Sequence, residues 1–215
     1  MDDGLLQFAL RAFATLIVVV DPLGVTPMFV ALTGDMDRAR QKKTLSRALL
    51  IAFSVTLFFL LGGGFLLSYL GVTVPAFAIS GGILLFLAAL PMLFGQRTGL
   101  QAPERHEQGA VGEDIAIFPL AIPLLSGPGT ITTVLLLTNQ IRGDLARIAV
   151  FAAVIAAVYL LAWWILYAGE RVMARLGEGK VHIITRVLGI VLAALAVQYI
   201  LGGVTDYYAS LAGGK

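Results

Sequence analysis

Six apolar stretches, each about as long as a helix that crosses a bilayer, dominate this sequence. They lie at about residues 5–33, 45–70, 74–95, 115–141, 145–169 and 182–203. A helical span needs roughly 20 apolar residues, and a helix satisfies its own backbone hydrogen bonds within hydrocarbon. The stretches therefore predict an all-α membrane protein, in which six transmembrane helices pack as one compact bundle in the lipid bilayer.

Composition excludes several other classes of protein. Hydrophobic residues make up 59% of the 215-residue chain and charged residues only 13%, whereas a typical soluble domain has about 25% charged residues. The formal net charge of +2 gives no reason to expect nucleic acid as a partner, and the absence of cysteine excludes thiolate zinc sites and cysteine nucleophiles. No Ser/Lys, paired-Asp or His/Glu constellation stands out, so we expect no enzyme activity, metal site or cofactor. The sequence does not indicate an oligomeric state.

The first and fourth stretches are interrupted near their middles. Residues 21–27 read Asp-Pro-Leu-Gly-Val-Thr-Pro and residues 126–130 read Ser-Gly-Pro-Gly-Thr, with Pro119 and Pro123 shortly before the second interruption. Proline removes a backbone donor and glycine weakens a helix. Because a broken helix exposes polar backbone groups, a membrane tolerates it only against protein or a water-filled cavity. We therefore expect the first and fourth spans to be discontinuous at a polar site.

The two interruptions occupy matching places in the two halves of the chain. Pro22 and Pro128 are 106 residues apart, as are Thr26 and Thr132, and the third and sixth stretches align at an offset of 107. Each half contains three spans, an odd number, so the halves must enter the membrane from opposite sides. The sequence thus predicts two inverted three-helix repeats, residues 1–105 and residues 106–215.

Basic residues in short loops predict the orientation of the chain. Eleven Lys and Arg residues lie in or beside the loops that follow the first, third and fifth stretches, and four lie on the other side. The eleven are Arg38, Arg40, Lys42, Lys43, Arg47, Arg97, Arg105, Arg171, Arg175, Lys180 and Arg186, and the four are Arg11, Arg142, Arg147 and Lys215. This bias predicts a multi-pass protein of the bacterial cytoplasmic (inner) membrane with both termini on the periplasmic or extracellular side.

Inverted repeats with paired broken helices are typical of a transporter whose binding site lies near the middle of the membrane. Backbone N–H groups at the start of a half-helix can bind an anion, and carbonyls freed before it can hold a cation, so a zwitterion such as an amino acid suits both. Asp21 is the acidic residue placed deepest in a span, where a charge costs about 2.5–3.5 kcal/mol. It is an ammonium ligand, a proton carrier, or only the N-cap of the half-helix that begins at Pro22.

The other polar and small residues at the breaks have two interpretations each. Hydroxyl groups either face a cavity or bond to carbonyls of their own helix, and the residues concerned are Thr26, Thr132 and Thr133. Small residues either expose backbone to a ligand or only kink the helix, and these are Ser126, Gly127 and Gly129. The Gly81 and Gly82 pair in the third stretch is expected to allow close helix packing.

The motifs at both breaks resemble those of a known family. Residues 21–27 resemble the Asp-Pro-(Ile/Leu)-Gly-x-x-Pro signature of the MarC family of membrane proteins. Residues 119–133 resemble its second signature, which usually ends in Ala-Gly-Pro-Gly-Ala-Ile-Thr-Thr, and residues 79–86 and 186–198 are similar to its third and sixth spans. This chain has Ser126 and Thr130 where alanine is common, which adds two hydroxyl groups at the second break.

The resemblance implies a six-span carrier of neutral amino acids, in a family with members that look like carriers of glycine and alanine. It places the substrate contacts on residues 21–27 and 126–133, which adds Pro22, Gly24 and Thr130 to the residues named above. We therefore predict a secondary transporter of small neutral amino acids, glycine or alanine, with Asp21 as the candidate for proton coupling. The alternatives are an exporter of drugs or other small metabolites, and a passive channel.

Overall fold

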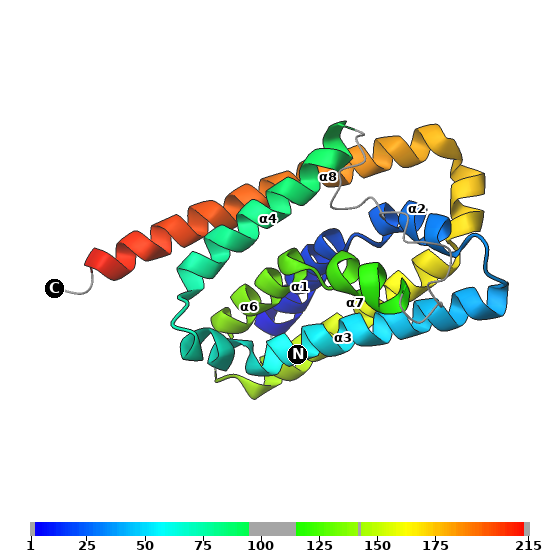
Figure 1. The fold of residues 1–215 in the computed structure, drawn as a ribbon. Helices are drawn as coiled ribbons and strands as arrows, with labels where there is room; N and C mark the ends of the chain where they lie inside the picture. Colours follow the sequence, from blue (N-terminus) through cyan, green and yellow to red (C-terminus); the bar gives the residue numbers. More distant parts are fainter. Residues whose placement is uncertain (1–2, 95–114, 142, 213–215) are drawn as a thin grey trace.

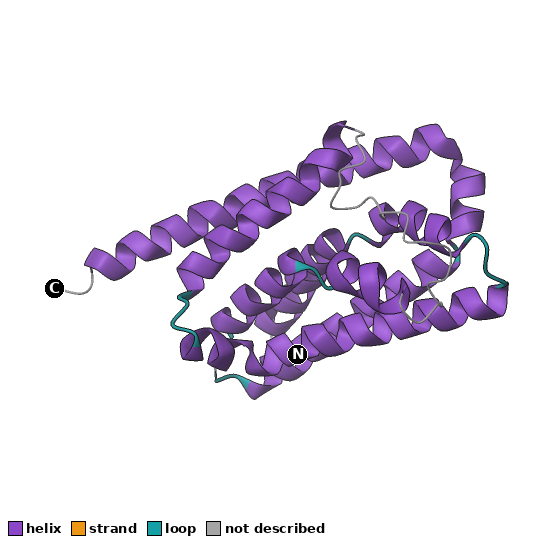
Figure 2. Ribbon diagram, in the orientation of Figure 1, coloured by secondary structure: helices purple, strands orange, loops and turns teal. Residues whose placement is uncertain are grey.

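The described part of the chain folds into helices joined by short turns. The computed structural model describes residues 3–94, 115–141 and 143–212, and no strand occurs among them (Figure 1 and Figure 2). The elements are α1 (Asp3–Val20), α2 (Pro22–Thr33), α3 (Arg38–Tyr69), α4 (Val74–Phe94), the irregular helix η1 (Ala116–Leu125), α6 (Pro128–Gln140), α7 (Leu145–Tyr167) and α8 (Gly169–Ala212). The predicted all-α fold is confirmed.

Several of these helices are suited to a bilayer. Five helical segments are long and apolar enough to cross a membrane, and the number is six if η1 and α6, which meet at a bend of 50°, form one broken span. Side chains on the outward face of α3 are themselves apolar, and Leu50, Phe58, Leu61 and Phe65 are each more than half exposed. A helix that is apolar on its outward face as well as its inward face is typical of a membrane span. The chain is therefore a multi-pass membrane protein.

Some predicted boundaries are wrong because the helices continue beyond the apolar stretches. α3 begins at Arg38 rather than at residue 45, and α8 extends from Gly169 to Ala212 rather than from 182 to 203. Only Ala168 separates α7 from α8, so the loop expected before the sixth span is absent. The Arg, Lys, Gln and Glu residues in these extensions are good helix formers. They keep the chain helical where hydropathy no longer marks it.

α4 and α8 form a pair that lies along one side of the other helices. Figure 1 shows the two helices side by side and antiparallel, α4 in teal to green and α8 in orange to red. The main apolar core lies among α1, α2, α3, η1, α6 and α7. A second apolar cluster attaches the α4–α8 pair to the end of α1, and it consists of Val19, Leu85, Ala89, Leu192 and Ala196.

Two adjacent glycines allow α4 to pack closely against two neighbours. A β-carbon at Gly82 would lie 2.7 Å from the carbonyl oxygen of Ala196 in α8. A β-carbon at Gly81 would collide with the side chain of Thr132 in α6. Neither position has room for a side chain, so the close packing expected of this glycine pair is confirmed.

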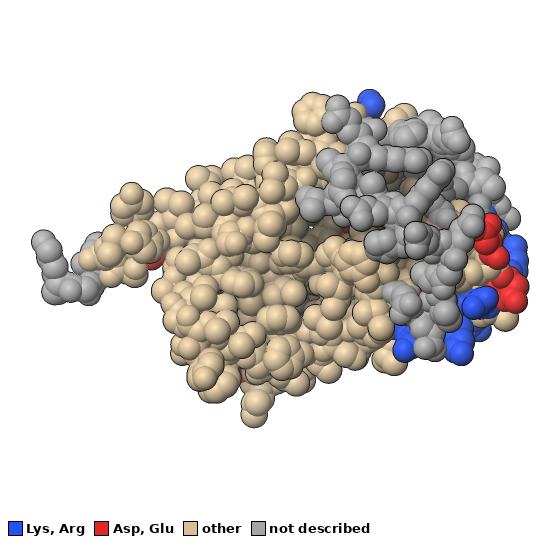
Figure 3. All heavy atoms as spheres, viewed as in Figure 1, with Lys and Arg blue, Asp and Glu red and all other residues tan. Residues whose placement is uncertain are grey.

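Many of the exposed charged side chains of the described residues gather at one end of the molecule, which we call the charged end. The exposed charged residues around the start of α3 are Asp35, Asp37, Arg38, Arg40, Lys42 and Lys43. Figure 3 shows charged side chains at this end, whereas most of the remaining face in view is uncharged. Arg97, Arg105, Arg142, Lys215 and the predicted boundary between the repeats lie outside the described residues, as do the side chains of Arg175 and Lys180. The described part thus combines exposed apolar side chains along its helices, which we call the apolar band, with a charged end suited to water.

The fit of Gly81 against Thr132 can be tested by adding one methyl group. We expect Gly81→Ala to lower the free energy of unfolding by about 1–3 kcal/mol, because the added β-carbon overpacks the contact between α4 and α6. Gly202→Ala is the matched control, since a β-carbon at Gly202 has no neighbour within 4 Å. Thermal unfolding of the purified variants in detergent measures both, and equal stability of the two variants would contradict the predicted contact.

Candidate functional site

The first break is a single residue, Asp21, between α1 and α2. Its backbone is left-handed (φ 46°, ψ 59°), a conformation that costs a residue with a side chain roughly 1–2 kcal/mol and that aspartate adopts more readily than most. The Asp21 N–H still donates to the carbonyl of Ile17 at 3.1 Å, and the Asp21 carbonyl accepts from the N–H of Val25 at 3.0 Å. The break is shorter than the predicted residues 21–27, because Pro22 fits the first position of a helix and Pro27 lies within α2.

The carboxylate of Asp21 caps α2. Its Oδ1 accepts a hydrogen bond from the N–H of Gly24 at 3.0 Å, so the N-cap interpretation is confirmed. A β-carbon at Gly24 would collide with the carboxylate, which explains why glycine stands there. The Asp21 side chain is partly buried, and its Oδ2 has no hydrogen bond within the described residues. The cap therefore leaves one carboxylate oxygen for a ligand or a proton, and those roles stay predictions.

The second break is longer and begins earlier than predicted. Phe118 (φ −129°, ψ 127°) and Ile122 (φ −127°, ψ 124°) are extended within η1. Each precedes a proline through a cis peptide bond, and the position before a proline disfavours helical backbone. The chain becomes regular again at Pro128, where α6 begins. Irregular backbone thus runs from Phe118 to Gly127, rather than from 126 to 130.

The carbonyl of Leu125, at the end of η1, is held by two hydroxyl groups. Tyr159 of α7 donates to it at 3.1 Å, and Thr130 of α6 donates at 3.3 Å. The hydroxyl of Thr56 in α3 lies 2.7 Å from the Tyr159 hydroxyl. These contacts are buried, where an unpaired carbonyl would be costly. Three helices therefore share the stabilisation of the second break.

The start of α6 has no side-chain cap. Its N-cap residue is Gly127, which has no side chain to accept a hydrogen bond, and its first residue is Pro128. Gly127, Gly129 and Thr130 are buried. The N–H groups at this helix start, together with the positive end of the helix dipole, form an arrangement that can bind an anion.

Most hydroxyl groups at the breaks bond to backbone carbonyls nearby rather than facing a cavity. For Thr26 and Thr133 this is the second of the two interpretations given above, whereas for Ser126 the bond was not predicted. The bonds are Thr26 Oγ1 to Pro22 O at 2.7 Å, Ser126 Oγ to Ala121 O at 2.9 Å, and Thr133 Oγ1 to Gly129 O at 2.9 Å. Thr133 Oγ1 also accepts from the hydroxyl of Tyr199 in α8 at 3.0 Å.

The hydroxyl of Thr132 differs from these, because it forms no such bond in the described part of the chain. The Thr132 side chain is only 1% exposed, and its Oγ1 has no hydrogen-bond partner within the described residues. A buried hydroxyl that lacks a partner costs about 1–3 kcal/mol. Thr132 therefore offers an unused donor and acceptor one turn into α6.

The two breaks lie close together through α1 and α6. Gly129 packs against Val19 of α1 and Leu85 of α4, and a β-carbon at Gly129 would lie 3.4 Å from Val19 Cγ1. Val19 is two residues before Asp21. No hydrogen bond within the described residues joins residues 21–27 to residues 126–133, so the start of α6 lies against the end of α1 while the polar groups of the breaks remain separate.

Sequence reasoning missed Thr56, Tyr159 and Tyr199. Each of these residues carries a hydroxyl inside a predicted span, and such a hydroxyl needs a hydrogen-bond partner on another helix. That feature could have identified them in the sequence. In the part of the chain that the structure describes, no three His, Asp or Glu side chains gather as a metal site would require.

Comparisons with known proteins agree with this architecture. A family model described as "MarC family integral membrane protein" matches residues 6–208. No solved structure matches the chain.

Three curated relatives illustrate the similarity. A "UPF0056 membrane protein" of Archaeoglobus fulgidus is 34% identical over 208 residues, which is 97% of each chain. A "UPF0056 membrane protein" of Aquifex aeolicus is 34% identical and covers 91% of this chain and 92% of its own. The "UPF0056 inner membrane protein YhgN" of Escherichia coli is 34% identical and covers 91% of this chain and 95% of its own. With its helical spans, its two signature segments and these matches over nearly its whole length, the chain belongs to the MarC family of integral membrane proteins.

Proposed function

We propose that this protein is a secondary transporter of small neutral amino acids, glycine or alanine, in the bacterial cytoplasmic membrane. In this proposal η1 and α6 form one span, which makes six, and residues 1–105 and 106–215 are inverted three-span repeats. The charged end faces the cytoplasm and both termini face away from it, because short basic loops stay inside. The name of the E. coli relative, an inner membrane protein, supports the location.

The start of α6 is the observation that carries the proposal. Its residues Gly127, Gly129 and Thr130 are buried while Pro128 is exposed, it has no side-chain cap, and the unpaired hydroxyl of Thr132 lies one turn into the helix. A helix N-terminus of this kind binds anions. The carboxylate of an amino acid is such an anion, and Gly129 and Thr130 would donate their backbone N–H groups to it.

Asp21 supplies the opposite charge for the substrate. Its Oδ2 has no bond within the described residues, and Pro27 has no N–H with which to satisfy the carbonyl of Leu23 four residues earlier. In this proposal the substrate ammonium group binds to Asp21 Oδ2, and the carbonyl of Leu23 is a second acceptor near the start of α2. If Asp21 takes up a proton, the same oxygen couples transport to the proton gradient.

The packing around the α6 start favours a small substrate. A β-carbon at Gly129 would collide with Leu85, and one at Gly81 would collide with Thr132. These contacts leave little room for a large side chain, which supports glycine or alanine over drugs. Alternating access would come from rocking of the broken helices against the other spans.

Substitution of Asp21 by asparagine separates its charge from its capping role. Asparagine caps helices as well as aspartate does, so we expect Asp21→Asn to fold normally. We expect its gradient-driven uptake to fall by about tenfold or more, because a hydrogen bond to a charged group is worth roughly 1.5–3 kcal/mol. Uptake of radiolabelled alanine and glycine into proteoliposomes, with and without a pH gradient, measures this.

Asp37→Asn is the matched control, since Asp37 caps α3 through the N–H of Arg40 at 2.7 Å and is exposed. Uptake that survives in Asp21→Asn and still follows the gradient would leave Asp21 as a helix cap only. Absence of saturable flux of either amino acid in folded wild-type protein would contradict the carrier proposal, and would favour the exporter or the channel.

Competition by larger amino acids tests the size of the site. We expect leucine and phenylalanine to compete with alanine at least about tenfold more weakly than glycine does, because extra methylene groups in a tightly packed site cost about 1–3 kcal/mol. Inhibition of labelled alanine uptake by each amino acid measures the ranking. Strong inhibition by leucine or phenylalanine would rule out the assignment to glycine and alanine.

Tyr159 should support transport indirectly, by keeping the second break in shape. Tyr159→Phe removes a donor to the buried carbonyl of Leu125, so we expect the free energy of unfolding to fall by about 1–3 kcal/mol, with reduced uptake. Tyr208→Phe is the matched control, because Tyr208 is 66% exposed near the end of α8. If both variants match the wild type in thermal unfolding and in uptake, Tyr159 does not hold the break.

A further inference from the structure

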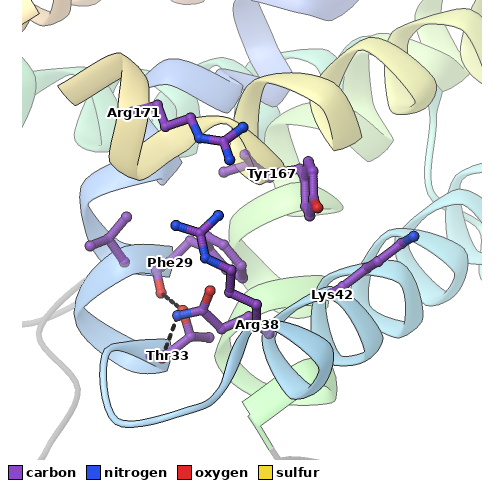
Figure 4. Close-up of a pocket in the computed structure, with 9 residues that line it drawn as sticks. Phe29, Thr33, Arg38, Lys42, Tyr167 and Arg171 are labelled. Atoms are coloured by element: carbon purple, nitrogen blue, oxygen red, sulfur yellow. Dashed lines mark hydrogen bonds between the residues drawn. The ribbon is translucent and has the colours of Figure 1, made fainter. Parts of the chain in front are cut away.

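A pocket opens at the charged end, away from both breaks. It lies between the end of α2, the start of α3, the end of α7 and the start of α8. Figure 4 shows its labelled residues, with Phe29 and Thr33 on one side and Tyr167 and Arg171 on the other. Nothing in the proposed transport mechanism uses this pocket.

The side chains that line the pocket are unbalanced in charge. They include the cations Arg38, Lys42 and Arg171, and among the described residues that line the pocket none is acidic. Figure 4 shows the guanidinium groups of Arg38 and Arg171 pointing towards each other from α3 and α8. Arg38 already takes part in another interaction, and its five N–H donors allow it to serve more than one acceptor. Cations that converge from separate helices favour an anion between them, and paired guanidinium groups suit phosphate.

Backbone carbonyls at the end of α2 would repel an anion if they were free. The last carbonyl, that of Thr33, accepts from Gln41 Nε2 at 3.0 Å and from the N–H of Met36 at 3.0 Å. The carbonyl of Phe29 accepts from the Thr33 hydroxyl at 2.7 Å. These bonds occupy the carbonyls of Phe29 and Thr33, two of the acceptors at the helix end. α2 and α7 end at the pocket while α3 and α8 begin there, so the helix dipoles largely offset one another. The side-chain charges therefore dominate the electrostatic potential in the pocket.

The surroundings of the pocket indicate a lipid rather than a soluble anion. Tyr167 lines the pocket and stacks on Trp163 with ring centroids 4.9 Å apart, and Lys42 Nζ lies 5.8 Å from the Trp163 centroid. Aromatic residues of this kind mark the level of lipid headgroups. Tyr167, Trp164 and Leu160 are 44%, 59% and 62% exposed. They form a stripe on one face of α7 that leads from the apolar band to the rim of the pocket.

We propose that this pocket binds the phosphate group of an anionic phospholipid, with the acyl chains lying along the stripe on α7. Arg38 and Arg171 would hold the phosphate oxygens, and Lys42 would lie beside the headgroup. The inference rests on the membrane location of the chain and on the proposed orientation, and it does not depend on the proposed transport activity. Basic pockets between transmembrane helices at the cytoplasmic side are known to bind anionic headgroups.

Native mass spectrometry of the full-length protein in detergent, titrated with phosphatidylglycerol or phosphatidylcholine, tests the site. We expect the wild type to bind one phosphatidylglycerol at least about tenfold more tightly than phosphatidylcholine, and the double substitution Arg38→Gln and Arg171→Gln to lose about tenfold of that affinity. The matched control is Arg40→Gln with Lys43→Gln, which removes two exposed charges of α3 that do not line the pocket. We expect the control to bind as the wild type does.

The remaining outcomes distinguish a specific site from general electrostatic attraction, and a lipid from a soluble phosphate. An equal loss in the control variant would show general surface attraction and overturn the site, as would equal binding of the two lipids by the wild type. Inorganic phosphate or glycerol 3-phosphate that displaces phosphatidylglycerol at millimolar concentration would overturn the lipid in favour of a soluble phosphate. If the double variant does not fold, Arg171→Gln alone applies the same test, with an expected loss of about threefold.

Discussion

The hydrogen-bonding requirement of the backbone within the apolar band is the constraint on which this fold depends. A continuous helix meets it, but this chain interrupts two of its helices, and each interruption needs a substitute for the lost bonds. At the first break the substitute is local, because the carboxylate of Asp21 bonds the N–H of Gly24. At the second break it is partly tertiary, because the hydroxyl of Tyr159 in α7 bonds the carbonyl of Leu125 together with the hydroxyl of nearby Thr130. The packing of α7 and α3 against η1 therefore helps to stabilise the broken helix.

The two breaks lie at matching positions in the sequence but differ in chemistry. The offset of 106 residues that relates Pro22 to Pro128 also relates Asp21 to Gly127, and these two are the N-caps of α2 and α6. One cap carries a negative charge, and the other has no side chain at all. The same offset relates Thr26, whose hydroxyl bonds to its own helix, to Thr132, whose hydroxyl is unpaired. One helix start is therefore capped by a carboxylate and the other has uncapped N–H groups, which is the polarity that the proposed zwitterionic substrate would require.

The features that the sequence predicts are those that depend on residues close together in the chain, whereas contacts between distant residues were missed. The apolar stretches and the cap at Asp21 depend on neighbouring residues or on composition, so the sequence predicted them. The glycine pair at Gly81 predicted close helix packing, but it did not identify Thr132 as the neighbour. The bond from Tyr159 to Leu125 spans 34 residues and its contact with Thr56 spans 103. No local pattern selects such partners. The extent of the second break was also missed, because two prolines indicate a distortion without showing how far the backbone departs from a helix.

The position of α8 constrains any movement at the breaks. The start of α8 lies against α2, where a β-carbon at Gly169 would be 2.7 Å from Thr26 Cγ2, and further along the same helix Tyr199 donates to Thr133 of α6. Both broken helices therefore contact a helix that is itself packed along α4 through Gly82. A shift of α6 relative to this pair must break the bond between Tyr199 and Thr133 or carry α8 with it. A shift of α8 in turn changes the surface on which Thr26 rests. The two halves of the candidate site are thus linked through α8 by contact, although no hydrogen bond within the described residues joins them directly.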